Sequence, residues 1–234
     1  MPVLEAEAPV AQKGRNTHQK LDGLIARARK HPPVKVAVAH PCDQVSLESA
    51  VAAAKLGLMT PILVGPEQRI RDVAAEHDLD ISSFEIVDAE YSQDSAAKAV
   101  ALVREGRAEA LMKGSLHTDE LMGAVVKRDT GLRTARRISH CFIMDVPEHD
   151  EPLVITDAAV NIAPDLKGKV DITQNAIDLV HALGQKEARV AILTFGRDPQ
   201  SSDVQFLETR PHLLRREPKA EQPPLLGREL VYES

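Results

Sequence analysis

The sequence lacks several features that would place it in a specialised class of protein. It has no tryptophan, 3% aromatic residues and only two cysteines in 234 residues. No apolar run approaches the roughly 18 residues of a membrane-spanning helix, and the amino terminus has no signal-peptide core. We therefore expect no membrane association and a cytoplasmic location. The two cysteines, Cys42 and Cys141, form no CxxC pair, so we expect them to be reduced and buried.

Common catalytic and ligand-binding motifs are also missing. The chain contains no Walker A, GxGxxG, HExxH or GxSxG sequence, which argues against the usual nucleotide, zinc and hydrolase functions. No group of aspartates is spaced for a metal, and we expect no metal site. The net charge of -6 argues against a general nucleic-acid-binding protein, because contacts to phosphates need clustered positive charge.

What the chain does have is an ordinary globular composition, 43% hydrophobic and 27% charged. Residues 1–15 show no periodicity and are expected to form a disordered tail. From residue 16 onward, apolar strands and amphipathic helices alternate at intervals of about 25 residues, which is typical of βαβ units and a doubly wound parallel sheet. This α/β fold is the prediction for residues 16–137, which we regard as the first lobe.

Local signals set the bounds of the expected elements. Pro32 and Pro33 end the first helix, and Asp43 and Ser92 are candidate caps of two later ones. The expected strands are Val34–Ala39, Ile62–Val64, Phe84–Val87, Ala110–Met112, Cys141–Met144, Leu153–Thr156 and Val190–Leu193. The expected helices are residues 16–30, the segment between Asp43 and Gly57, residues 67–77, the segment from Ser92 to Glu105, a helix opening near Thr118, and about 169–183.

The pattern changes near residue 138. The apolar segments Ile138–Val146 and Leu153–Thr156 are separated by only six residues, too few for a crossover helix. We expect an antiparallel hairpin here and the start of a second α/β lobe. That lobe, residues 138–195, is expected to be incomplete, with residues 196–234 a divergent, disordered tail. A cleft between two lobes is a usual place for a ligand.

An anion site is indicated where the strand ending at Met112 meets the next helix. Gly114 and Ser115 follow the strand and Thr118 opens the helix, so a glycine turn and hydroxyl groups face a helix amino terminus. Arg133, in the following loop, is the best placed of the nearby arginines to grip a phosphate. The segment from Asp157 to Asn161 is expected to face this site from the second lobe.

Several residues have an ordinary structural explanation beside a functional one. The segment His40–Asp43 is either a turn with a helix cap or a loop at the ligand end of the sheet. His117 is either an acid/base group or a cap or surface residue, and Asp157 is either a functional carboxylate or a helix cap. Arg136 and Arg137 are either anion ligands or part of a solvated face. The sequence leaves these alternatives open.

Four segments carry a resemblance to a known family, in the order expected for it: Lys113–Thr118, Thr130–Arg133, Ile143–Pro147 and Thr156–Pro164. Together they resemble the phosphate acetyl/butyryltransferases, most closely the transferase half of bifunctional enoyl-CoA hydratase/phosphate acetyltransferase proteins, over about residues 21–193. The resemblance implies a fold like that of the isocitrate and isopropylmalate dehydrogenases, with two α/β lobes around a cleft. A dehydrogenase activity is disfavoured, because the aspartates for its metal are missing.

The resemblance also implies a reaction. Acyl-CoA, with an acetyl or butyryl group, and phosphate would give acyl phosphate and CoA without a metal, a cofactor or a covalent enzyme intermediate. Ser115, Thr118 and Arg133 match the phosphate side of the cleft, and Asp157 and Asn161 match the segment that faces it. No residue is assigned as the general base, so the catalytic residues stay unknown. The number of subunits is open, with a homodimer as one option.

The resemblance ends after the strand Val190–Leu193. Family members continue with residues that complete the second lobe and supply part of the acyl-CoA and catalytic site. Here a proline-rich segment without periodicity follows, and codons for Glu208–Leu214 can spell a family-like Asp-Ala-Ala-Ala-Leu in another frame. We therefore expect a carboxyl-terminal truncation or frameshift, which the gene sequence can test.

Two functions follow from this expectation. One is a phosphate acyltransferase whose activity the missing part compromises. The other is a catalytically inactive remnant that at most binds CoA, phosphate or a partner subunit. An assay of acyl phosphate formation distinguishes them.

Overall fold

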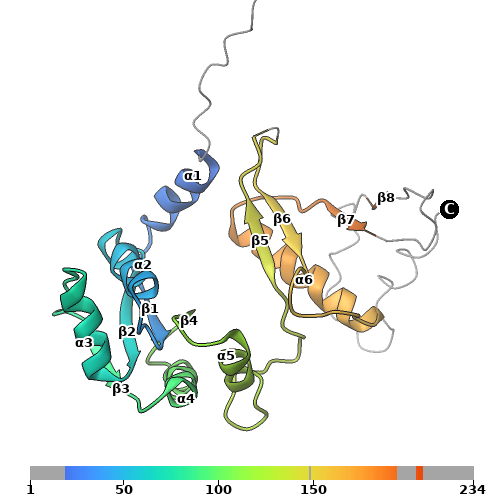
Figure 1. Ribbon diagram of the computed structural model, residues 1–234. Helices are drawn as coiled ribbons and strands as arrows, with labels where there is room; N and C mark the ends of the chain where they lie inside the picture. Colours follow the sequence, from blue (N-terminus) through green and yellow to red (C-terminus); the bar gives the residue numbers. More distant parts are fainter. Residues whose placement is uncertain (1–18, 148, 194–203, 208–234) are drawn as a thin grey trace, which may run out of the picture. The chain divides into compact units, whose positions relative to one another are not determined.

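The computed structural model describes residues 19–147, 149–193 and 204–207. The chain divides into two compact units (Figure 1). Unit 1 comprises residues 1–21 and 136–234, and unit 2 comprises residues 22–135. Helix α1 (Gln19–Ala28) runs through the boundary, with its first residues in unit 1 and the remainder in unit 2.

Unit 2 is built on a four-stranded sheet. Its strands are β1 (Val34–Ala39), β2 (Met59–Gly65), β3 (Glu85–Asp88) and β4 (Ala110–Lys113). They lie in the order β3-β2-β1-β4, and every neighbouring pair is parallel. The expected parallel α/β sheet is therefore confirmed. Because all strands run the same way, the turns that follow them meet at one edge of the sheet.

Helices cover both faces of this sheet (Figure 1). The helices are α2 (Gln44–Lys55), α3 (Glu67–Glu76), α4 (Ser92–Arg104) and α5 (Thr118–Val125). Side chains of β1 alternate between two apolar clusters, as the two-residue period of a strand requires. Val36 and Val38 pack with α2 and α3, while Ala37 and Ala39 pack with α4 and α5. The sheet is thus the middle layer of three.

Some bounds in unit 2 differ from the sequence expectation. Strand β2 begins at Met59, and its pairing with β1 includes Pro61 opposite Val36. Proline is disfavoured inside a sheet because it has no N–H group to donate to the neighbouring strand. Asp43 caps α2 as expected, because its carboxylate accepts from the backbone N–H of Ser46. The expected cap of α4 was wrong. Tyr91 occupies the N-cap position, and Ser92 is the first helical residue.

Unit 1 contains the expected hairpin. Strands β5 (Cys141–Met144) and β6 (Leu153–Thr156) pair antiparallel, which confirms the prediction made from the short connection. Helix α6 (Leu166–Ala182) packs against this hairpin (Figure 1). It begins earlier than residue 169, because the Asp165 carboxylate accepts from the Gly168 backbone N–H at 2.8 Å and caps the first turn.

A second two-stranded sheet in unit 1 joins β7 (Val190–Leu193) and β8 (Val204–Leu207), which pair antiparallel. The four residues of β8 lie within residues 196–234, and the expectation that this segment is a disordered tail stays a prediction. The apolar run of β8 supplies a partner for the edge of β7. The other residues of the expected tails, 1–15, 196–203 and 208–234, lie outside the described residues.

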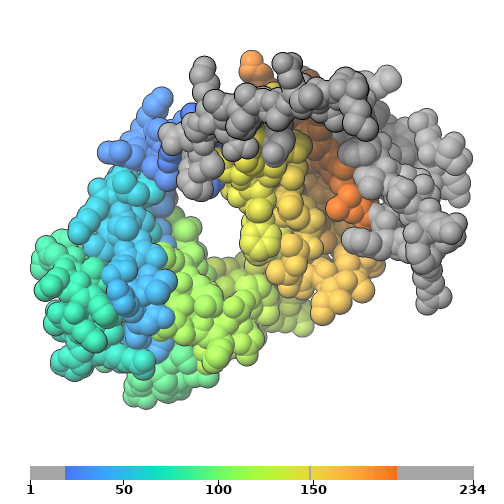
Figure 2. Space-filling model, turned by 45° about the horizontal axis from the view of Figure 1, so that its top comes forward, coloured from blue at the N-terminus to red at the C-terminus, as the bar shows by residue number. Residues whose placement is uncertain are grey.

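The hairpin exposes much of its apolar surface. The pairs Phe142–Ile155 and Met144–Leu153 place four side chains on one face, each at least 40% exposed. The hairpin is visible in yellow in Figure 2. Strand β6 contacts α6, and Ile172, Ala176 and Ile177 of that helix are the only buried apolar residues described in unit 1. Two lobes around a cleft, the second of them incomplete, stay a prediction.

Candidate functional site

The turn after β4 approaches the end of β1 closely at Gly114. The Gly114 N–H donates to the Ala39 carbonyl at 2.8 Å. A Cβ added to Gly114 would lie 2.5 Å from the carbonyl oxygens of both Ala39 and His40, closer than real Cβ contacts allow. The glycine is therefore required because two stretches of backbone meet here.

Hydrogen bonds of Ser115 join this turn to the turn after β1. Its N–H donates to the His40 carbonyl at 2.9 Å, and its hydroxyl donates to the same oxygen at 2.8 Å. The hydroxyl also accepts from the Cys42 N–H at 3.3 Å. The proton of the Ser115 hydroxyl is thus used inside the protein, so towards a ligand this oxygen acts as an acceptor.

His40 has an unusual backbone conformation. Its φ of 57° lies in the left-handed region, which few residues other than glycine adopt. This conformation aims the His40 carbonyl at Ser115, and the segment His40–Asp43 is both a cap for α2 and part of the candidate site. The helix-cap explanation is confirmed by Asp43, and a role of this loop in ligand binding stays a prediction.

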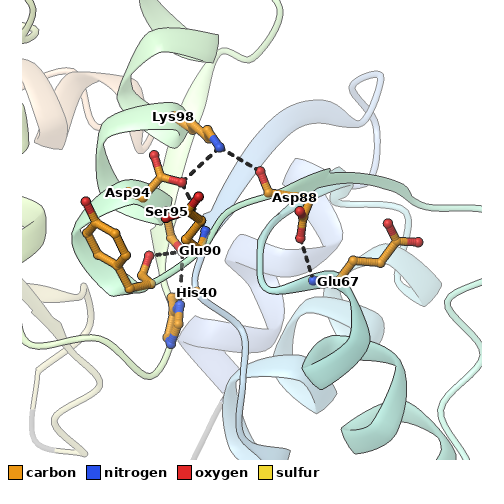
Figure 3. A network of polar contacts seen from close by, with 8 residues as sticks. His40, Glu67, Asp88, Glu90, Asp94, Ser95 and Lys98 are labelled. Carbon is orange, nitrogen blue, oxygen red and sulfur yellow. Dashed lines mark hydrogen bonds and ion pairs between the residues drawn. The ribbon is translucent and has the colours of Figure 1, made fainter.

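The His40 side chain binds the amino-terminal turn of α4 (Figure 3). Its Nδ1 lies 3.0 Å from the Ser95 hydroxyl, which itself donates to the Tyr91 carbonyl at 2.9 Å. Both side chains are buried. Burial lowers the pKa of His40 below its ordinary value, and the nearby positive charge of Arg69 lowers it further, whereas Glu120 acts in the opposite sense. The ring is therefore neutral at neutral pH.

Polar contacts also hold the loop between β3 and α4 in place (Figure 3). The Asp94 carboxylate accepts from the Glu90 N–H at 3.0 Å and forms an ion pair with Lys98 at 2.8 Å. Lys98 donates in addition to the Asp88 carbonyl at 2.9 Å. These contacts fix the loop that carries Tyr91, the carbonyl partner of Ser95.

Glu120 links the starts of α4 and α5. Its carboxylate accepts from the Ser92 hydroxyl at 2.8 Å and from the His117 N–H at 2.9 Å. The Ser92 hydrogen bond is the main reason that the pKa of Glu120 is lowered. His117 is the N-cap residue of α5 and is exposed, and the expected Thr118 is the first helical residue, also exposed. Gly114 and Ser115 thus lie between β4 and α5, and Thr118 opens α5; that the three residues form one binding site stays a prediction.

Arg133 is the remaining expected site residue in unit 2. It is exposed and has no polar partner among the residues that the structure describes. Its neighbour Leu132 packs against the same apolar cluster as Leu116 and Leu121, next to the Ser115 turn. Arg133 is thus free to bind a ligand, and its contact with a ligand at Ser115 stays a prediction.

Asp157 and Asn161 belong to unit 1, where they organise a turn after β6. The Asp157 carboxylate accepts from the backbone N–H groups of His140, Ala159, Val160 and Asn161 and from the Asn161 amide. Burial raises the pKa of Asp157, but these hydrogen bonds outweigh burial and the net pKa is lowered. No helix starts at Asp157, so the helix-cap alternative was wrong. Whether the segment faces the Ser115 turn stays a prediction.

The two arginines after Arg133 have partners in unit 1. Arg136 forms an ion pair with Asp178 at 2.5 Å, and the Arg137 N–H donates to Asp171 at 3.0 Å. The Arg137 guanidinium also reaches the side-chain oxygen of Asn161 at 3.4 Å. Both arginines are exposed, which agrees with the solvated-face explanation, although their partners hold them on the unit 1 surface.

The described residues contain no disulfide and no cluster of metal-binding side chains. Both cysteines are free, with Cys42 buried as expected and Cys141 only half-buried. Burial raises the pKa of Cys42 to about 11, so its thiol stays protonated. Among the described residues, no group of three or more His, Cys, Asp and Glu side chains is placed to hold a metal ion. No helix in this part of the chain is long and apolar enough to cross a membrane.

Comparison with known proteins agrees with this α/β architecture. The family model Phosphate acetyl/butaryl transferase matches residues 21–98 and 89–214. Phosphate acetyltransferase from Rhizobium meliloti is 63% identical over 175 residues, 75% of this chain and 55% of that protein. Phosphate butyryltransferase from Clostridium beijerinckii is 38% identical over 173 residues, 74% of this chain and 57% of that protein.

A solved structure also resembles the chain. The branched-chain phosphotransacylase from Enterococcus faecalis superposes with a TM-score of 0.53 at 26% identity, over 65% of this chain and 52% of that one. The chain therefore belongs to the phosphate acetyl/butaryl transferase family, as the sequence motifs indicated. It spans about half the length of the curated relatives it matches. The family match extends past Leu193, where we expected the likeness to end.

Proposed function

We propose that this chain is a phosphate acyltransferase that converts acyl-CoA and phosphate into acyl phosphate and CoA, with an acetyl or butyryl group. The observation that carries the proposal is the 63% identity to phosphate acetyltransferase from Rhizobium meliloti over 175 residues. The reaction needs a place for the dianionic phosphate beside the thioester carbonyl. No cofactor enters this scheme, because acyl-CoA and CoA are substrate and product.

The turn after β4 suits the phosphate. Gly114 and Ser115 sit at the carboxyl edge of a parallel sheet, and α5 begins at Thr118 with its first N–H groups unpaired within the helix. We assign Gly114, Ser115 and Thr118 to the phosphate site, with Arg133 supplying positive charge. We also assign Asp157 and Asn161, which belong to unit 1, to the substrate-binding residues.

A second candidate function remains beside the acyltransferase. The chain matches about half the length of these relatives. The alternative is a catalytically inactive chain that binds CoA, phosphate or a partner subunit. We further propose a fold of the isocitrate dehydrogenase type with two lobes, a homodimer and a cytoplasmic location, which a crystal structure, light scattering and cell fractionation test.

Acyl phosphate formation from acetyl-CoA and butyryl-CoA tests the activity. We expect turnover in the wild-type chain and its loss in Arg133→Ala. Arg128→Ala is the matched control, because Arg128 is also an exposed arginine of unit 2 without a polar partner among the described residues. Equal turnover in both variants contradicts the assignment of Arg133. No turnover in the wild type, with phosphate or CoA still raising the melting temperature, supports the inactive binding chain.

A further inference from the structure

The imidazole of His40 has a definite proton arrangement. The Ser95 hydroxyl carries one proton, and it donates that proton to the Tyr91 carbonyl at 2.9 Å. The contact of 3.0 Å between Ser95 Oγ and His40 Nδ1 therefore requires Nδ1 to be the donor. In a neutral imidazole only one nitrogen is protonated, so Nε2 carries a lone pair and is an acceptor.

This acceptor is unused within the described part of the chain. Nδ1 is the only ring nitrogen of His40 with a hydrogen bond, and Nε2 is not sealed from solvent even though the residue is only 8% exposed. Figure 3 shows the second ring nitrogen pointing away from Ser95 and the network around it. The His40 ring is thus held at Nδ1 by the hydrogen bond to Ser95, which in turn is bonded to Tyr91. Its Nε2 points away from these partners and can be reached by solvent.

The backbone of His40 connects this ring to the proposed phosphate site. The His40 carbonyl accepts both hydrogen bonds of Ser115, so the ring and the Ser115 turn belong to adjoining parts of one sheet edge. The charges that act on the ring come from α3 and α5, through Arg69 and Glu120. Glu120 lies in the first turn of α5, the helix whose amino terminus follows Ser115. His40 therefore lies at the same edge of the sheet as the proposed phosphate site.

We propose that His40 Nε2 accepts the hydroxyl proton of hydrogen phosphate, and so selects hydrogen phosphate over sulfate and serves as a catalytic residue. This inference rests on the proposed function. Near neutral pH hydrogen phosphate carries an O–H group, whereas sulfate has the same shape and charge but no proton to donate. An imidazole lone pair that faces the anion accepts the hydroxyl proton of hydrogen phosphate and repels sulfate.

The same nitrogen accounts for the proton in the reaction. An oxygen of hydrogen phosphate forms the new C–O bond to the thioester carbonyl carbon, and its hydroxyl proton moves to Nε2. The C–S bond then breaks, the electron pair stays on sulfur, and the proton on Nε2 passes to the CoA thiolate. In the reverse direction Nε2 takes the proton of the CoA thiol, which makes the thiolate nucleophile. The scheme balances without any other reactant.

Anion binding tests the inference without turnover. Calorimetric titration of the full chain with phosphate and with sulfate is expected to show a preference for phosphate of about tenfold or more, the size of one hydrogen bond to a charged group. His40→Asn is the informative variant, because asparagine tolerates left-handed backbone and can donate to Ser95 but lacks Nε2. It should bind both anions about equally. The control His31→Asn, at an exposed position before β1, should keep the preference.

A second measurement, on the wild-type chain, tests the inference even if His40→Asn fails to fold. Nitrogen-15 spectra of the wild-type ring are expected to show Nδ1 protonated and Nε2 unprotonated, with Nε2 shifting on addition of phosphate and not of sulfate. A protonated Nε2, equal binding of the two anions by the wild type, binding of neither, or a preference kept by His40→Asn would each overturn the inference. A chain that selects phosphate but forms no acyl phosphate contradicts the proposed function and leaves the role of His40 in binding standing.

Discussion

Units 1 and 2 both contain strands and helices, yet they are stabilised differently. In unit 2 a four-stranded sheet is covered on both faces and two apolar clusters fill the interior. In the described part of unit 1, two separate two-stranded sheets accompany α6, and three apolar residues are buried. A two-stranded hairpin alone is marginal in water, so unit 1 depends on what packs against it. Periodicity predicts elements, but only layered packing gives them a core.

Polar contacts add to the few buried apolar residues described in unit 1. The Asp145 carboxylate accepts hydrogen bonds from the backbone N–H groups of Lys20 and Leu21 at the start of α1. It also accepts from the Lys20 ammonium at 3.0 Å. Arg136 and Asp178 form an exposed ion pair. Exposed ion pairs contribute little to stability, typically below about 1 kcal/mol. The rigid edge that carries Gly114 and Ser115 therefore belongs to the better-packed unit, as precise positioning of a substrate requires.

The strongest test of this contrast makes one chemical change in each unit. Leu63→Ala removes a fully buried side chain from β2, and we expect a loss of about 3 to 5 kcal/mol in the free energy of unfolding. Leu153→Ala makes the same change at a residue 40% exposed on β6, and we expect a loss below about 1 kcal/mol. Urea denaturation followed by circular dichroism measures both. Similar losses would mean that the exposed face of the hairpin is covered in solution.

Hydrogen exchange gives a second comparison, without any substitution. Backbone amides of β1 lie between two strands, β2 and β4, whereas those of β5 have only β6 as a neighbour among the described strands. We expect central β1 amides to exchange about 100-fold more slowly than those of β5, because local opening of the hairpin costs less than opening the sheet. Exchange followed by mass spectrometry of peptides measures this. Equal protection of the two strands would contradict the difference in packing.

A glycine pair tests the close approach at the candidate site. In Gly114→Ala the new Cβ would lie 2.5 Å from two carbonyl oxygens, so β1 and the turn after β4 must move apart. We expect a loss of about 2 kcal/mol, typical of overpacking. Gly123→Ala, in α5, meets no atom within 4 Å and is expected to gain about 0.5 to 1 kcal/mol from helix propensity. Thermal melts of both variants suffice, and a neutral Gly114→Ala would show that the turn is not in contact with β1.

The fold of unit 2 was largely predictable because its signals are local. The β-branched run Val34–Ala39 and the cap at Asp43 each lie within a few residues and appear where expected. The six-residue connection likewise predicted the β5–β6 hairpin. Strand β8 was missed because its only support is a pairing with β7, and Pro61 hid the true start of β2. Contacts between distant segments override local propensity in both places.

The site was predictable only in part, for the same reason. The sequence placed Gly114, Ser115 and Thr118 together because a glycine and hydroxyls follow an apolar strand. It did not reveal why Gly114 must be glycine, since the obstructing carbonyls come from β1. It also did not connect His40 with Ser95, which lies 55 residues away. A histidine directly after a buried strand was the one available signal, and its left-handed backbone has no signature in the sequence.

The smallest expected effect concerns the Asp157 turn of unit 1 in acid. Hydrogen bonds lower the pKa of Asp157 below its ordinary value of about 3.9, despite the opposing effect of burial. A carboxyl group with a lowered pKa in the native state stabilises it fully above the ordinary pKa. This contribution is lost as the pH falls through the lower native pKa, because protonation removes the acceptor that the backbone N–H groups need.

Asp157→Asn should therefore lower stability at neutral pH and flatten the acid dependence between about pH 5 and pH 2. Asp150→Asn, at an exposed aspartate of the hairpin connection without a polar partner among the described residues, is the matched control and should leave both unchanged. Urea midpoints of unit 1 across this pH range measure the effect, and a wild-type acid dependence retained in Asp157→Asn would show that this turn does not depend on the carboxylate.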